Sequence, residues 1–390
     1  MLASIQILVL VTVTASLVYW LLPAGWIEGR RAVLLVVSGV LIYIWSPETL
    51  LIAVLTALLA WLLYALTWRH PRYGWLPWLI VLPLVVNAIV PLSDLIPLPV
   101  GSPRSPLLTN LATLGLSFYT FKLYISIKQG LKLGRLPFRE VITTTLFYPA
   151  FPMGPIDGSQ KFDREALSRD PDVRRWVMGV GRIGIGVVKV FVLGAWVKGT
   201  LSVELFGVPM EGVYAEGWPT PLHALAFAFV SFLYLYVNFS GFTDIAIGAG
   251  WMFNLDLTEN FRFPLIAHSI QNFWQRWHLT LAAFVSTYVF KPLVRRTGRP
   301  ALAIFVAFTL VGLWHEVSLG YLLWGLGHGS ALALTLAYRE RMRGRALLPA
   351  RLRRIAGVPV TLAFVAFLSA VANADSPTRL VNYLEALVGL

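Results

Sequence analysis

The chain has 390 residues, of which 57% are hydrophobic and 13% are charged, with a mean hydropathy of +0.70. A water-soluble globule of this length cannot bury so much apolar surface, so the composition excludes an ordinary soluble domain and predicts an integral membrane protein. The absence of cysteine excludes disulfides, thiolate metal sites and cysteine nucleophiles.

Apolar runs of about 20 residues, the length that crosses a bilayer as a helix, recur along the chain. They predict an all-α polytopic membrane protein with about ten to twelve transmembrane helices plus re-entrant segments. The first run lacks a basic leader and a small-residue cleavage site, so it is expected to be a retained helix. The runs are about 2–22, 32–47, 49–68, 75–95, 106–126, 177–199, 222–238, 301–316, 319–338 and 356–373.

Basic residues gather at the ends of these runs. Arg30 and Arg31 follow the first run, and the loops 161–175 and 339–354 are rich in Lys and Arg, whereas 201–219 has neither and carries three Glu. The net charge of +13 is therefore interpreted as the positive-inside bias. Basic loops are expected to face the cytoplasm, with the N-terminus outside, and nucleic acid is not expected as a partner.

The chain shows no repeat and no soluble domain. It is predicted to form a single membrane domain over 1–390, with apolar scaffold helices at 1–100, a catalytic core at 105–340 and C-terminal helices at 341–390. The proline-rich stretch Pro91 to Pro106 is expected to be a surface loop, because proline disrupts a helix interior.

The segment Phe147 to Asp157 contains three prolines and a glycine. Such a sequence cannot form a straight helix, and broken backbone at membrane depth is tolerated only where protein or a water-filled cavity covers it. The segment is therefore either a re-entrant loop that lines a pocket or an ordinary cytoplasmic loop.

A second polar region runs from Val237 to Thr280. Asn238 and Asp244 are spaced as on a helix, and a break follows at Asn260 to Pro264. The segment Asn272 to His278 comes next.

Within Asn272 to His278, Trp274 and His278 share one helical face, and Asn272 and Arg276 share another. An interfacial helix would explain Trp274 and Trp277 as an aromatic belt and Arg276 as a snorkelling side chain. It explains His278 less well, so a functional site that includes His278, Asn272 and Asp244 is the second interpretation.

A third region contains Trp314-His315-Glu316 and then Leu323 to Gly329. His315 ends one apolar run, and His328 lies within the next. Histidine at membrane depth marks a functional site by default, although a buried histidine bonded to a backbone carbonyl is the simpler alternative. No His-Glu-x-x-His and no other ligand spacing occurs, so no metal is expected.

The order of these motifs resembles the membrane-bound O-acyltransferase family. The motifs are Asn238 to Asp244, Glu259 to Pro264, Phe273 to His278, Gly312 to His315 and Trp324 to Gly329. Gly154 to Asp157 is similar to the bacterial branch that includes alginate O-acetylases and the D-alanyl transfer protein of teichoic acids. Two positions depart from the pattern of that branch, Ser286-Thr287 and Glu316.

The resemblance implies a multi-helical enzyme of the bacterial cell membrane that moves an acyl group from a thioester to a hydroxyl. It implies that His315 is the catalytic histidine, in a central tunnel, and that His278 is the second signature residue. The donor would be acetyl-CoA or an acyl carrier protein on the cytoplasmic side, with no bound cofactor. The acceptor would be a cell-envelope polysaccharide or glycopolymer. The expected partners are membrane lipid and, as a candidate, a periplasmic acyltransferase.

The chemistry of the residues agrees with this assignment. A thioester is already activated, so the reaction needs a base near neutral pH, which imidazole supplies. Hydrogen-bond donors for the oxyanion could come from His278, Asn272 or a tryptophan indole. The supporting residues predicted around the two histidines are Asn238, Asp244, Asn272, Trp274, Arg276, Trp277, Trp314 and His328.

Two other functions stay open from the sequence. Polar, broken helices at mid-membrane also build the substrate sites of transporters and flippases. A non-catalytic assembly partner could have kept the same fold.

Overall fold

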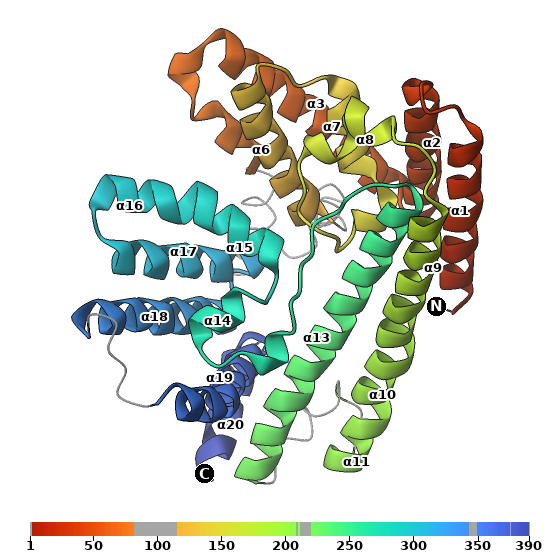
Figure 1. The fold of residues 1–390 in the computed structure, drawn as a ribbon. Helices are drawn as coiled ribbons and strands as arrows, with labels where there is room; N and C mark the ends of the chain where they lie inside the picture. Colours follow the sequence, from red (N-terminus) through yellow and green to blue (C-terminus); the bar gives the residue numbers. More distant parts are fainter. Residues whose placement is uncertain are drawn as a thin grey trace, which may run out of the picture. The chain divides into compact units, whose positions relative to one another are not determined.

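The computed structural model describes residues 2–81, 115–207, 210, 220–342, 349–374 and 376–389. These residues form helices and connecting loops without a β-strand (Figure 1), which confirms the predicted all-α class. The helices are α1 (Leu2–Leu21), α2 (Ile27–Trp45), α3 (Pro47–Arg69), α6 (Leu116–Leu133), α7 (Phe138–Leu146), α8 (Arg164–Leu167), α9 (Val173–Val187), α10 (Gly194–Trp196), α11 (Ser202–Phe206), α13 (Pro221–Met252), α14 (Ile270–Trp274), α15 (Leu279–Val285), α16 (Lys291–Thr297), α17 (Pro300–His315), α18 (Leu319–Arg341), α19 (Ala350–Ala372) and α20 (Pro377–Val388).

The chain is a multi-pass membrane protein. Five helical stretches within the described residues are long and apolar enough to cross a bilayer: Pro47–Arg69, Val173–Phe206, Pro221–Met252, Leu319–Arg341 and Arg351–Ala372. The shorter apolar helices are Ile7–Leu21 and Pro300–His315. The total of ten to twelve stays a prediction, because the expected runs 75–95 and 106–126 and the loop Pro91 to Pro106 lie partly or wholly outside the described residues.

The contacts divide the chain into two compact units. Unit 1 contains residues 1–187 and 241–259, and unit 2 contains residues 188–240 and 260–390. Helix α13 contributes its first part to unit 2 and its last part to unit 1. The division into scaffold, core and C-terminal helices stays a prediction.

In unit 1, the two arginines after α1 are structural and do not lie in a loop. Arg30 and Arg31 belong to the first turns of α2, and each is at most 2% exposed. Arg30 donates hydrogen bonds to the carbonyls of Leu22 and Leu167, and Arg31 donates to the carbonyl of Phe162. Buried guanidinium groups need such acceptors, so these charges fix the loops that they contact.

The proline-rich segment Phe147 to Asp157 is buried within unit 1. The Nζ of Lys122 on α6 donates to the carbonyl of Ala150 at 2.5 Å. The two carboxylate oxygens of Asp157 accept bonds from the backbone and side chain of Thr258, at 2.9 and 2.6 Å. The segment is therefore held by protein on both sides, and neither cavity described below includes it.

In unit 2, α17 and α18 form a tightly packed hairpin (Figure 1). A Cβ atom on Gly312 of α17 would collide with the carbonyl of Tyr321, and one on Gly325 of α18 would lie 2.7 Å from the carbonyl of Phe308. Only glycine permits this approach at both positions. The close crossing brings the C-terminal end of α17, which is His315, against the first turns of α18.

Candidate active site

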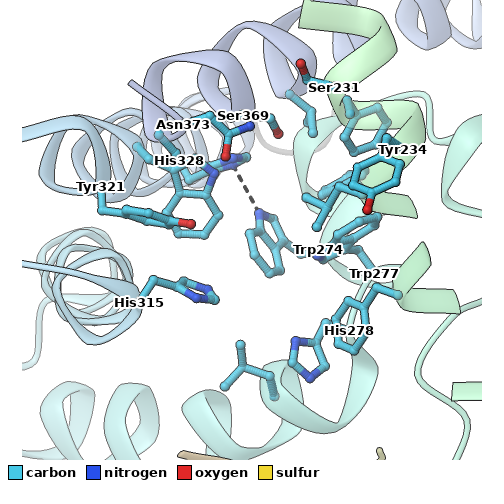
Figure 2. A pocket seen from close by; sticks show the side chains of 18 of the residues that line it. Ser231, Tyr234, Trp274, Trp277, His278, His315, Tyr321, His328, Ser369 and Asn373 are labelled. Atoms are coloured by element: carbon cyan, nitrogen blue, oxygen red, sulfur yellow. Dashed lines mark hydrogen bonds between the residues drawn. The ribbon is translucent and has the colours of Figure 1, made fainter. Parts of the chain in front are cut away.

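Unit 2 contains a cavity of about 440 Å³, which we call the main cavity (Figure 2). Its lining comes from Lys198 and Met210, from α13, from the segment 273–281, from α17 and α18, and from the C-terminal end of α19 with Asn373. His278, His315 and His328 all line it. Three histidines around one mostly apolar space are the arrangement expected of a reaction site within a membrane protein.

His315 is the last residue of α17, and its side chain is exposed through the cavity that it lines. Figure 2 shows its ring pointing into the open space. Tyr321 stacks on the ring at 5.4 Å between centroids, and Trp324 meets it edge to face at 5.6 Å. The two aromatic residues of α18 therefore fix the imidazole while leaving it accessible to a substrate.

His278 lies on the other side of the same open space and is only 3% exposed. Its backbone is left-handed, with φ of 43° and ψ of 57°, a conformation that side-chain-bearing residues adopt rarely. Helix α14 ends at Trp274, and α15 begins at Leu279. The expectation that Trp274 and His278 share one helical face is therefore wrong, because the chain turns at His278.

The turn at His278 is fixed by Asn260, which is fully buried. The carbonyl of Asn260 accepts from the backbone of Leu279 at 2.9 Å, and its side-chain oxygen accepts from the hydroxyl of Thr280 at 2.6 Å. Two residues before His278, the carbonyl of Arg276 accepts from the backbone of Arg262 at 2.9 Å. Backbone strain persists only where its surroundings determine it, and these bonds supply that constraint.

Trp274 and His328 form a hydrogen-bonded pair in the wall of the cavity. The indole Nε1 donates to Nδ1 of His328 at 3.3 Å (Figure 2). His328 is 1% exposed, and Trp324 lies 4.6 Å from its ring centroid. Trp324 therefore contacts both His328 and His315.

A second cavity, of about 250 Å³, has Trp274 and Leu281 in common with the main cavity. These two side chains therefore separate the two spaces. The polar residues of the second cavity are Gln271, Gln275 and Ser286. Arg339, near the end of α18, donates to the side-chain oxygen of Gln271 at 2.7 Å.

The other predicted residues lie in several places. Trp277 lines the main cavity. Asn272 and Arg276 do not line it; Arg276 lies beyond the end of α14, and its Nε donates to Oδ1 of Asn272 at 3.0 Å. Trp314 packs against His315 at 4.3 Å between centroids.

Asn238 and Asp244 are not among the residues that line the main cavity. Asn238 lies on α13 near Gly194. Asp244 belongs to unit 1, where it accepts from Nε of Arg182 at 3.0 Å. Arg182 also forms two bonds of 2.6 Å with Glu259, so Asp244 is part of an ion-paired cluster.

Sequence reasoning missed several lining residues: Lys198, Ser231, Tyr234, Tyr321, Ser369 and Asn373. For some of these residues the sequence did contain a signal, a polar residue within an apolar helix. Lys198 lies in a candidate membrane span, and Ser369 and Asn373 are four residues apart at the end of an apolar helix. Polar groups in such helices mark cavities by default.

The described residues contain no group of three His, Asp or Glu side chains that could hold a metal ion. The three histidines bring imidazole chemistry to the main cavity. A neutral imidazole accepts a proton, and tryptophan and histidine N–H groups donate hydrogen bonds to a developing negative charge.

The model of the membrane-bound O-acyltransferase family (MBOAT) matches residues 64–373. The chain therefore belongs to this family and is an acyltransferase. The family is polytopic, which agrees with the apolar helices described above. The matched range includes every residue that lines the two cavities.

Individual relatives act on different polymers, according to their names. Over 304 residues, 74% of each chain, the protein is 26% identical to a teichoic acid D-alanyltransferase of Bacillus subtilis. Over 249 residues, 61% of this chain and 45% of the relative, it is 32% identical to a probable alginate O-acetylase of Pseudomonas aeruginosa. Over 133 residues, 33% of this chain and 24% of the relative, it is 36% identical to a peptidoglycan O-acetyltransferase of Helicobacter pylori. The chain thus spans three quarters of the first relative and less than half of the other two.

Proposed function

We propose that this protein transfers an acyl group, acetyl or a similar small group, from a cytoplasmic thioester to a hydroxyl of a cell-envelope polysaccharide or glycopolymer. His315 acts as the general base. The observation that carries the proposal is the placement of His315 at the end of α17, with its ring in the cavity that His278 also lines. The polymers named for the relatives support the acceptor class.

The reaction needs no covalent acyl-enzyme. A ring nitrogen of His315 takes the proton of the acceptor hydroxyl as its oxygen attacks the thioester carbonyl carbon. The tetrahedral intermediate then collapses, the carbon–sulfur bond breaks, and the imidazolium returns the proton to the leaving thiolate. General base catalysis of this kind contributes about a hundredfold to ten-thousandfold in rate.

The negative charge on the intermediate's oxygen needs donors in a water-poor space. His278 is our candidate, because it is buried, lines the same cavity and has a fixed backbone. Loss of one such donor costs about a hundredfold to a thousandfold.

The donor is proposed to be acetyl-CoA or an acyl carrier protein. Both are anionic, and clustered arginines attract anions at long range. Arg339 at the end of α18 contacts Gln271 of the second cavity, which gives that space a basic neighbour. A bacterial inner-membrane location, with basic loops in the cytoplasm, is part of the same proposal, and a periplasmic acyltransferase stays a candidate partner beside direct transfer.

The test compares acylation of surface glycans in the host lacking the protein after complementation with the parent or with His315→Ala. Mass spectrometry should show acyl groups restored by the parent and not by the variant, with both proteins present in the membrane at equal levels. Equal acylation by both would contradict the role of His315, and no change on deletion would contradict the glycan acceptor.

A further inference from the structure

Tyr321 brings a phenol hydroxyl into the main cavity, beside the ring of His315. Both side chains line the cavity, and their rings stack at 5.4 Å between centroids with an interplanar angle of 27°. Figure 2 shows the ring of His315 and the hydroxyl of Tyr321 directed into the same open space. The hydroxyl is therefore within reach of a molecule that reacts at His315.

The hydroxyl of Tyr321 has no partner within the part of the chain that the structure describes. It forms no hydrogen bond there, and it is not one of the polar atoms buried away from open space. A tyrosine in an apolar setting usually finds a partner for its O–H group. A ring that only packed against His315 would need no hydroxyl, so the free O–H group points to a bound molecule as its partner.

The hairpin of α17 and α18 fixes the position of Tyr321. Its backbone N–H donates to Oγ of Ser318, the residue that caps α18, at 3.3 Å. Its carbonyl lies where a Cβ atom on Gly312 would be, three residues before His315 on α17. The same close crossing therefore positions both the phenol and the imidazole. Donors that are fixed in advance stabilise a developing charge without reorganising during the reaction.

Resting on the acyl transfer proposed above, we infer that Tyr321 is a further catalytic residue, whose hydroxyl donates a hydrogen bond to the carbonyl oxygen of the thioester as the tetrahedral intermediate forms. When the acceptor oxygen attacks the carbonyl carbon, the π electron pair moves onto the carbonyl oxygen. The phenol keeps its proton and stabilises this charge. The pair then re-forms the carbonyl as the carbon–sulfur bond breaks.

The intermediate would thus receive donors from two sides of the open space. Tyr321 lies on the side of His315, and His278 lies across from it (Figure 2). The division of work is that His315 moves the proton of the acceptor hydroxyl, whereas Tyr321 acts only on the charge of the carbonyl oxygen.

The test removes the hydroxyl and keeps the ring. Tyr321→Phe should lower the initial rate of acyl transfer about a hundredfold to a thousandfold, the effect of losing one oxyanion donor. The host lacking the protein is complemented with the parent or the variant under an inducible promoter. Mass spectrometry follows the acyl groups on its surface glycans with time after induction, at equal amounts of protein in the membrane.

A second measurement separates catalysis from acceptor binding. Isolated membranes with the parent or with Tyr321→Phe receive the cytosolic fraction of the host as thioester source and increasing amounts of unacylated glycan extracted from the deletion host. Loss of an interaction made only in the transition state lowers kcat and kcat/KM equally, so KM for the glycan should not change. A raised KM with unchanged kcat would assign Tyr321 to acceptor binding and overturn the inference.

The matched control is Tyr338→Phe, because Tyr338 lies on the same helix, is 44% exposed and lines neither cavity. It should transfer at the rate of the parent. Incorporation of 4-aminophenylalanine at position 321 returns an N–H donor to the same ring and should recover part of the rate lost in Tyr321→Phe. A purely structural role of the ring predicts equal rates for the parent, Tyr321→Phe and the amino variant, and that result would overturn the inference.

The outcomes separate this inference from the proposed function. If His315→Ala is inactive and Tyr321→Phe matches the parent, His315 keeps its role and only the inference on Tyr321 is wrong. If His315→Ala also matches the parent, the proposed function fails. Should Tyr321→Phe not fold, 4-methoxyphenylalanine at position 321, which has the ring and the oxygen but no O–H group, should show the same loss, and an undiminished rate would overturn the inference.

Discussion

The indole of Trp274 donates a hydrogen bond to Nδ1 of His328, at 3.3 Å. This bond assigns Nδ1 as the acceptor, so the neutral ring of His328 carries its proton on Nε2. Since Trp324 contacts both His328 and His315, the pair helps to fix the aromatic wall against which the proposed base lies.

We expect Trp274→Phe to lower the rate of acyl transfer about two- to tenfold, the range of a neutral hydrogen bond. Phenylalanine keeps an aromatic ring between the two cavities but cannot donate to His328. The measurement is kcat and KM in reconstituted membranes. A change in KM alone, with kcat unaffected, would assign Trp274 to substrate binding and not to positioning.

Two substitutions of His278 separate the effect of its backbone conformation from the effect of its side chain. Both His278→Ala and His278→Asn should lower transfer about a hundredfold to a thousandfold, because both lose the imidazole. Only His278→Ala should also be destabilised, by about 1 kcal/mol, since asparagine tolerates a left-handed backbone better than alanine does. Thermal unfolding of the two variants in detergent measures the difference, and equal stability would show that the turn is not strained.

Gly312→Ala should destabilise the protein by about 1–3 kcal/mol and lower its activity. Its Cβ would meet the carbonyl of Tyr321 and lie 3.0 Å from Cα of Gly325, which would displace the end of α17 that holds His315. The control is Gly39→Ala within α2, where a Cβ meets nothing within 4 Å and should stabilise the helix by about 0.5–1 kcal/mol. Unchanged activity of Gly312→Ala would show that the tight crossing does not position His315.

Asp256 in unit 1 predicts a pH dependence of stability. Burial acts to raise the pKa of this carboxyl, but hydrogen bonds from Arg175 and Arg169 and their charges outweigh it, so the pKa lies below its usual value. A depressed carboxyl pKa contributes stability at pH above about 4, the unfolded value, and the contribution is lost as the pH falls through the folded value.

Asp256→Asn should therefore destabilise the protein at pH 7, by no more than about 1 kcal/mol because the site is half exposed. The difference from the parent should shrink progressively as the pH falls below about 4. Thermal unfolding from pH 3 to pH 7 gives the comparison. A difference as large at pH 3 as at pH 7 would mean that the asparagine disturbs packing and that the ion pairs are not responsible.

The sequence could predict those elements whose signal lies in the order of residues along the chain. Apolar length predicted α17 and α18, and it placed His315 at the end of one and His328 inside the other. Prolines and polar residues predicted the break at Asn260 to Pro264, which the structure confirms as irregular chain with a short 3₁₀ turn. The motif order predicted the family.

The left-handed backbone at His278 could not be predicted, because it depends on hydrogen bonds that Leu279 and Thr280 donate to Asn260, eighteen residues before His278 in the chain. The polar residues in the lining of the main cavity were missed for a related reason. Lys198 and Ser369 are ordinary interruptions of apolar helices until folding places both on one cavity. The spacing of Asp244 suggested a part in the site; the structure gives Asp244 Arg182 as a partner and does not place it in the lining of the main cavity.

The most direct test of the account measures acyl transfer in a single turnover, using purified chain in nanodiscs, a labelled thioester and a cell-envelope glycan of the proposed acceptor class. Our account predicts that His315→Ala, folded as the parent is, loses about a hundredfold to ten-thousandfold in rate, and that denatured parent protein carries no label. A rate for His315→Ala within threefold of the parent, or label bound covalently to the parent chain, would contradict it.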